Sequence, residues 1–173
     1  MPVSVKGGIE LRKALRAYTP DLAKQMPKEI AAALKPVVKV ARGYVPDNGS
    51  ILSGWRSREN YTGRFPLFDS RSVKSGISYK TTPSKANSRG FRSLARLLNK
   101  TAAGAIYETM GRRTPSSRFV QNQRNKYGSE FKGQGKEQGT LLFRAYDEDR
   151  GLARDGVLRA IEKASKDFKR ATA

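Results

Sequence analysis

Apolar residues recur at helical spacing from about residue 19 to residue 44, with lysines and arginines falling largely between them. The apolar positions are Leu22, Met26, Ile30, Ala33, Val37, Ala41 and Tyr44. Thr19 and Pro20 are typical of an N-cap and a first helical position. Pro27 and Pro36 each remove a backbone hydrogen bond, yet the apolar positions stay in phase across Pro27. The pattern predicts one kinked helix, or two nearly collinear helices, ending at Gly43.

In the middle of the chain, apolar or small residues alternate with polar ones, which is the pattern of a strand. Apolar or small residues fall on one face and polar, basic or glycine residues on the other between Val73 and Thr81. We expect a strand there. A loop rich in serine, lysine, arginine and glycine runs from Thr82 to Arg92, and Leu94 to Leu98 is either a second strand or the end of a short helix.

The pattern in the last third of the chain predicts two helical regions separated by a long polar stretch. Thr101 is expected to cap a helix of small residues, Ala102 to Glu108, which ends near Gly111. Leu141 to Tyr146 begin a second helical region that continues at a 3.6-residue period to Ala171. Its polar side offers three i,i+4 ion pairs: Asp155–Arg159, Glu162–Lys166 and Lys163–Asp167.

These elements predict an α+β fold with a long N-terminal helix, a small antiparallel sheet, a C-terminal helix and long polar loops. We expect a single domain over residues 1–173, with extended loops at about 82–93 and 112–138. The second loop should be mobile in the isolated chain, because its low apolar content cannot offset its ordering entropy. The expected core comprises Leu22, Ile30, Val37, Trp55, Ile77, Tyr79, Ile106, Leu142, Ile161 and Phe168.

The amino-acid composition limits the kinds of catalytic and metal-binding site that the chain can form. The chain has 35 Lys and Arg against 15 Asp and Glu, a net charge of +20, and neither histidine nor cysteine. Cysteine nucleophiles, Cys/His zinc sites and disulfides are therefore excluded. No apolar run has the length of a signal peptide or a membrane span. We expect a soluble protein made in a cytoplasm, without a membrane partner, whose partners are polyanions or acidic protein surfaces.

Three segments could suggest a chemical site, and each has a simpler interpretation. The glycine-rich run 132–139 matches no phosphate-binding pattern and is read as a flexible loop. The acidic run Asp147 to Asp149 is read as a solvated segment, because adjacent acids point apart on a helix. Glu108 is read as a partner of Arg112 and Arg113. We therefore expect no catalytic residue, no metal site and no cofactor.

An ordered set of short motifs resembles a known family. A basic helix ends at Val45-Pro46, the turn Gly49 to Trp55 follows, and a strand lies near Ile77. The segment Leu97 to Arg112, which contains Ala-Ala-Gly-Ala-Ile-Tyr-Glu, then precedes a polar loop and a final helix. This order resembles the head–tail joining proteins of long-tailed bacteriophages, the neck or tail-completion family, with versions from phages of actinobacteria most similar.

The resemblance implies a non-enzymatic virion protein of the phage neck, assembled in the host cytoplasm. It would form a homo-oligomeric ring, a hexamer or dodecamer, that joins the DNA-filled head to the tail. Its neighbours would be a portal-side adaptor or stopper protein and the tail tube or tail terminator protein, and the neck protein and the tail terminator remain alternative identities. Packaged DNA would be contacted non-specifically.

The basic runs are spread over the chain, and their aromatics form no stacking pattern, so base-specific readout is not expected. The residues proposed to contact DNA or a neighbouring ring are Arg89, Arg92, Arg96, Arg112, Arg113, Arg118, Arg124 and Lys126. The first alternative function is a cellular nucleic-acid-binding protein, ribosome- or nucleoid-associated. The second is an enzyme acting on nucleic acid.

Overall fold

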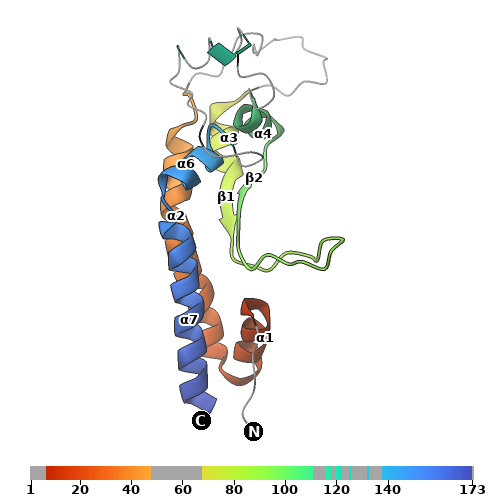
Figure 1. The fold of residues 1–173 in the computed structure, drawn as a ribbon, viewed down its shortest axis with the longest axis vertical. Helices are drawn as coiled ribbons and strands as arrows, with labels where there is room; N and C mark the ends of the chain where they lie inside the picture. Colours follow the sequence, from red (N-terminus) through yellow and green to blue (C-terminus); the bar gives the residue numbers. More distant parts are fainter. Residues whose placement is uncertain are drawn as a thin grey trace. The chain divides into compact units, whose positions relative to one another are not determined.

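The computed structural model describes residues 7–47, 68–110, 116, 117, 120, 121, 125, 132 and 138–172. In this part of the chain the elements are α1 (Gly8–Tyr18), α2 (Pro20–Gly43), α3 (Ser70–Gly76), β1 (Ile77–Lys80), β2 (Arg96–Asn99), α4 (Ala102–Thr109), α6 (Leu142–Glu148) and α7 (Leu152–Thr172) (Figure 1). The two strands pair in one sheet, so the expected α+β class is confirmed. Among the described residues, no helix combines the length and apolar character needed to cross a membrane.

Helix α2 continues through Pro27 and Pro36 as a single helix of 24 residues. Its apolar face explains why the prolines are tolerated, because Met26, Ile30, Val37 and Ala41 are buried along it. The predicted long helix and its start at Pro20 are thereby confirmed. Thr19 separates α2 from α1: its N–H donates to the Leu15 carbonyl at 2.8 Å, and its carbonyl accepts from the N–H of Ala23 at 3.1 Å.

The chain divides into two compact units. The first takes residues 1–36, 79–96 and 151–173, and the second takes residues 37–78 and 97–150. Both units draw on α2 and on the two strands, since the division falls within those elements. The expectation of a single domain stays a prediction.

In the first unit, α7 packs against α1 and against the first part of α2. Gly156 of α7 permits the close approach, because a Cβ there would lie 2.7 Å from the Cβ of Ala33. An ion pair joins the same two helices, with Lys163 Nζ 2.5 Å from Glu29 Oε1. The buried apolar side chains of this unit within helices are Leu11, Leu15, Met26, Ile30, Leu34, Ala153, Ala160, Ala164 and Phe168.

The predicted strand from Val73 to Thr81 is partly wrong. Residues Ser70–Gly76 form α3, and only Ile77–Lys80 are extended. The reason lies at Asp69, whose side chain accepts the N–H of Ser72 at 2.8 Å and caps the helix. Within α3, Val73 and Gly76 are the buried positions, a spacing of one helical turn. Of the two alternatives for Leu94 to Leu98, the structure has the strand, β2 at Arg96–Asn99, and the backbone bond from Lys100 N to Gly76 O extends the pairing.

The C-terminal helical region is interrupted between α6 and α7. Arg150 and Gly151 have φ values of 52° and 84°, in the left-handed region that ends a helix. None of the three expected i,i+4 pairs on α7 forms a direct ion pair, although the pKa of Lys163 is raised by Glu29 and, to a smaller extent, by Asp167. Lys163 pairs with Glu29, Asp155 with Arg154, and Asp167 with Arg170. Packing of α7 against α2 brings Glu29 to Lys163, which a single-helix pattern does not contain.

The expected core is confirmed at four positions: Ile30, Val37, Ile77 and Phe168 are buried. At five others the side chain is only half-buried: Leu22, Tyr79, Ile106, Leu142 and Ile161. The prediction was wrong where a neighbouring residue takes the inward position. Tyr107 and Leu141, next to Ile106 and Leu142, are almost completely buried. Trp55 lies outside the described residues.

Candidate functional site

The connection between β1 and β2 is an ordered hairpin that extends beyond the two strands (Figure 1). Ser84 N donates to Ser93 O at 2.9 Å across the two legs, and Asn87 N donates to Phe91 O at 2.9 Å near the tip. At the foot, Arg12 of α1 donates from Nη1 to the carbonyl of Thr81. Arg12 is only 7% exposed, and burial, with the nearby Arg16, lowers its pKa. The hairpin is thus anchored to α1.

Asn87 organises the hairpin tip. Its Oδ1 accepts the N–H of Arg89 at 3.0 Å and the N–H of Phe91 at 2.8 Å. Gly90 adopts a φ of +75°, which glycine tolerates without a side-chain clash. Phe91 consequently stands on a fixed turn and is 66% exposed. Sequence reasoning missed Phe91, because a loop without periodicity carries no signal for the exposure of an aromatic.

The eight basic residues predicted to contact DNA or a neighbouring ring fall into two groups. Arg89 and Arg92 are exposed on the hairpin, and Arg96 is half-buried at the start of β2. Arg92 Nε also donates to the Ser84 carbonyl at 3.0 Å. The other predicted residues, Arg112, Arg113, Arg118, Arg124 and Lys126, lie outside the described residues. The structure therefore brings three of the eight together on one hairpin.

Glu108, in the motif that carries the family resemblance, is a buried carboxylate at the end of α4 and is 4% exposed. Its Oε2 accepts the N–H of Leu142 at 2.8 Å and its Oε1 accepts the N–H of Phe143 at 2.9 Å. These are the first N–H groups of α6, which have no partner within their own helix. Glu108 therefore fastens α6 to α4 across more than thirty residues of sequence. The arginines expected to pair with it lie outside the described residues.

The residues around Glu108 are shaped to receive its side chain. A Cβ at Gly139 would lie 2.0 Å from Glu108 Oε1, so any other residue at position 139 would displace the carboxylate. Thr140 bonds the same helix end, since its Oγ1 donates to the Tyr107 carbonyl at 2.7 Å. Tyr107 is 1% exposed and lies 5.6 Å from Phe68 between ring centroids. Within the motif, Tyr107 therefore packs in the interior, and Glu108 caps the beginning of α6.

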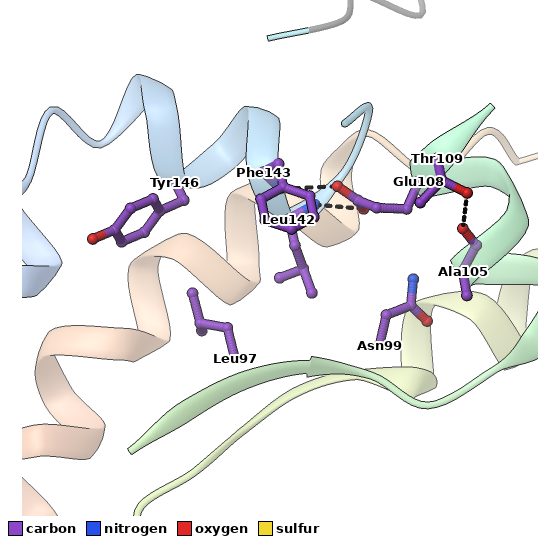
Figure 2. A pocket seen from close by; sticks show the side chains of 8 residues that line it. All are labelled: Leu97, Asn99, Ala105, Glu108, Thr109, Leu142, Phe143 and Tyr146. Carbon is purple, nitrogen blue, oxygen red and sulfur yellow. Dashed lines mark hydrogen bonds between the residues drawn. The ribbon is translucent and has the colours of Figure 1, made fainter. Parts of the chain in front are cut away.

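A cavity of about 490 Å³ adjoins this junction. Figure 2 shows Leu97 and Asn99 projecting from β2 on one side, with α6 on the other. The lining is mainly apolar and consists of Leu97, Asn99, Ala105, Glu108, Thr109, Leu142, Phe143 and Tyr146. Asn99 Oδ1 accepts from Thr101 Oγ1 at 3.2 Å, while its Nδ2 is buried without a hydrogen-bond partner in the described part of the chain.

A charged cluster holds the other end of α6. The Tyr44 hydroxyl donates to Glu148 Oε2, while Lys132 Nζ and Arg144 Nε lie 3.0 and 3.1 Å from Glu148 Oε1. The Arg144 guanidinium also lies 3.9 Å from the centroid of the Tyr44 ring. The Tyr44 hydroxyl, Lys132 and Arg144 lower the pKa of Glu148 to about 2, although burial acts in the opposite direction. Burial, followed by the Glu148 carboxylate, raises the pKa of Tyr44.

Among the described residues, no group of three or more Asp or Glu side chains is placed to hold a metal ion. Glu108 and Glu148 are each engaged by hydrogen-bond donors of the chain itself. Two features are therefore candidates for a functional site. One is the basic hairpin with its exposed aromatic tip, and the other is the hydrogen-bonded α4–α6 junction beside an apolar cavity. No known protein family, curated protein or solved structure matches the chain.

Proposed function

We propose that this chain is a non-enzymatic structural subunit of a phage neck. In this proposal it assembles into a homo-oligomeric ring, a hexamer or dodecamer, between the portal-side adaptor or stopper protein and the tail tube or tail terminator protein. The ring joins the DNA-filled head to the tail, and packaged DNA passes it without sequence-specific contact. The proposed location is the neck of the virion.

The observation that supports this proposal is the pair of hydrogen bonds that Glu108 accepts from the backbone of α6. The motif around it, Ala102 to Glu108, is the most specific part of the resemblance to head–tail joining proteins. Both oxygens of the Glu108 carboxylate accept backbone N–H groups of α6, so this acid serves architecture. A structural role for the motif is what a ring subunit requires, because such a subunit works by holding its shape and its neighbours.

A second candidate function is a cellular protein that binds nucleic acid without sequence preference, either ribosome- or nucleoid-associated. The observation that favours it is the hairpin, whose cations Lys85 and Arg89 are exposed and form no ion pair within the described residues. Such a protein would bind duplex DNA as its main activity. It would have no affinity for a connector or a tail tube.

Reconstitution separates the two candidates. The purified chain is mixed with the portal-side connector and with the tail tube protein from the same genome, and the products are examined by native mass spectrometry and electron microscopy. The proposed function predicts closed rings of six or twelve copies of the chain that associate with one of these components. A chain that stays monomeric with both, while binding ribosomes or bulk DNA tightly, would support the cellular alternative.

A further inference from the structure

The hairpin from Tyr79 to Arg96 lies wholly in the first compact unit. All of its charged side chains are positive. Between Asp69 and Glu108 the chain contains no acidic residue. The cations of the hairpin are Lys80, Lys85, Arg89, Arg92 and Arg96. Among the described residues none of them makes an ion pair, whereas Lys163 on α7 is paired with Glu29. The hairpin therefore presents positive charge that the described part of the chain does not neutralise.

These cations occupy both legs of the ribbon. Lys80 and Lys85 lie on the outgoing leg, Arg92 and Arg96 on the returning leg, and Arg89 at the tip. The two legs lie close together, so the exposed cations Lys80, Lys85 and Arg92 are concentrated along the hairpin, while Arg96 is half-buried at its foot. Such a concentration of positive charge is complementary to the phosphates that border a groove of duplex DNA, and a two-stranded hairpin is narrow enough to enter the major groove, which is about 12 Å wide.

The tip adds an apolar contact to this charge. Phe91 is 66% exposed, and the two hydrogen bonds to Asn87 Oδ1 hold its backbone in a defined turn. Exposed apolar side chains at the ends of basic elements contact sugars and bases when proteins enter a groove. Because the turn is already ordered, little conformational entropy is lost when Phe91 makes such a contact.

An acidic protein surface is the competing partner. It would need a continuous acidic surface beside an apolar pocket in order to match both the exposed cations of the hairpin and the aromatic tip. Duplex DNA supplies both features along its whole length, irrespective of sequence, because phosphates line every groove and bases and sugars form its floor. Charge complementarity therefore favours DNA.

We infer that the 79–96 hairpin is a preformed arm that binds duplex DNA, with Lys85, Arg89 and Arg92 on phosphates and Phe91 in the groove. The biological setting of this inference, DNA held at the neck, rests on the proposed function. The binding itself does not, because it can be measured with the purified chain and DNA alone.

The first test measures the contribution of charge. Binding of the full-length protein to a fluorescent duplex of mixed sequence is followed by anisotropy over a series of salt concentrations. Lys85→Gln with Arg89→Gln should reduce the slope of log K against log salt by about 1.8, since each phosphate contact contributes about 0.9. The matched control, Lys35→Gln with Lys39→Gln, removes the same charge from exposed positions of α2 and should leave the slope nearly unchanged. Equal slopes for the two double variants would overturn the inference.

The second test concerns the aromatic tip. Phe91→Ala should weaken binding about 5-fold or more while leaving the salt slope unchanged, because it removes an apolar contact and no charge. Leu158→Ala, which truncates a 50% exposed side chain on α7, is the control and should bind as the parent protein does. Both side chains are exposed, so thermal unfolding should confirm that both variants fold. Unchanged affinity of Phe91→Ala would remove this residue from the interface.

Two further outcomes separate this inference from the proposed function. Failure of the parent protein to bind duplex DNA, together with binding to polyglutamate that depends on Phe91, would identify an acidic protein as the partner and overturn the inference. If the Lys85/Arg89 and Phe91 variants lose DNA affinity as predicted, the inference is supported, whether or not rings form with the connector. Ring formation is scored separately, so either idea can fail without the other.

Discussion

Glu108 and Leu142 are joined by a hydrogen bond of 2.8 Å, from the backbone N–H of Leu142 to the Oε2 of Glu108. Thirty-four positions of sequence separate the two residues. The bond, with its counterpart to Phe143, ties the end of α4 to the beginning of α6. Glu108 is 4% exposed, and both oxygens of its carboxylate are occupied by these backbone donors.

Replacing Glu108 by alanine should therefore destabilise the fold, by at most roughly 2–6 kcal/mol, because two part-buried N–H donors would each lose a charged acceptor and the loss at a fully buried donor is about 1–3 kcal/mol. Glu108→Gln keeps one carbonyl acceptor and should lose about half as much. Chemical denaturation measures both, with Glu162→Gln on the exposed side of α7 as the control. A Glu108→Ala variant as stable as this control would show that the junction does not depend on the carboxylate.

Gly139→Ala tests the same junction from the opposite side. The added Cβ would lie 2.0 Å from Glu108 Oε1, so the carboxylate must move, at a cost of about 1–3 kcal/mol. In a Glu108→Ala background the side-chain obstacle is absent and only the backbone oxygen of residue 108, 3.0 Å from the added Cβ, remains, so the same substitution should cost less. A double-mutant cycle of unfolding free energies gives the coupling. Identical costs in the two backgrounds would contradict the geometry.

The pH dependence of stability should report the cluster at Glu148. Its pKa is about 2 in the folded protein, below the ordinary value of 4.5, chiefly because of the Tyr44 hydroxyl, with Lys132 and Arg144. A lowered folded-state pKa stabilises the fold above the unfolded-state pKa, and this stabilisation is lost as pH falls through the folded-state value. The free energy of unfolding should therefore decrease as pH is lowered from about 4.5 toward 2.

Glu148→Gln should flatten this decrease and lower stability at neutral pH, because the neutral amide cannot attract Lys132 and Arg144. Denaturation midpoints at several pH values between 2 and 7 provide the measurement. The control is again Glu162→Gln, which should retain the acid sensitivity of the parent protein. If Glu148→Gln and the parent lose stability in parallel, the acid sensitivity belongs to other carboxylates.

Two isoleucines should respond differently to truncation. Ile30 on α2 is completely buried, so Ile30→Ala should cost about 2–5 kcal/mol. Ile161 on α7 is half-buried, and Ile161→Ala should cost less than half as much, because water already reaches part of its side chain. Thermal and chemical unfolding of the two variants provide the comparison. A larger loss of stability from Ile161→Ala than from Ile30→Ala would show that α7 packs with a different face inward.

The sequence predicted those features that depend on near neighbours in the chain. The spacing of Met26, Ile30 and Val37 indicated α2, and Thr101 was expected to cap α4, which it does by accepting the N–H of Gly104 at 3.1 Å. Both signals are local. The α+β class followed from them, together with the strand at Ile77.

The features that escaped prediction depend on contacts between distant segments or on backbone geometry. Nothing in the neighbourhood of Glu108 indicates that Leu142 will bond to it, because a cap normally comes from its own helix. Lys163 pairs with Glu29 only once α7 packs against α2. The exposure of Phe91 depends on the turn that Asn87 and Gly90 form. Such relationships appear only when the chain is folded.

The proposal that this chain joins phage heads to tails is tested most directly by deleting its gene from a phage genome that encodes it and imaging the lysate by electron microscopy. The proposed function predicts filled heads and free, fully formed tails that are not joined, with infectious particles restored when the wild-type chain is supplied in trans. Joined, infectious particles from the deletion strain would contradict the account.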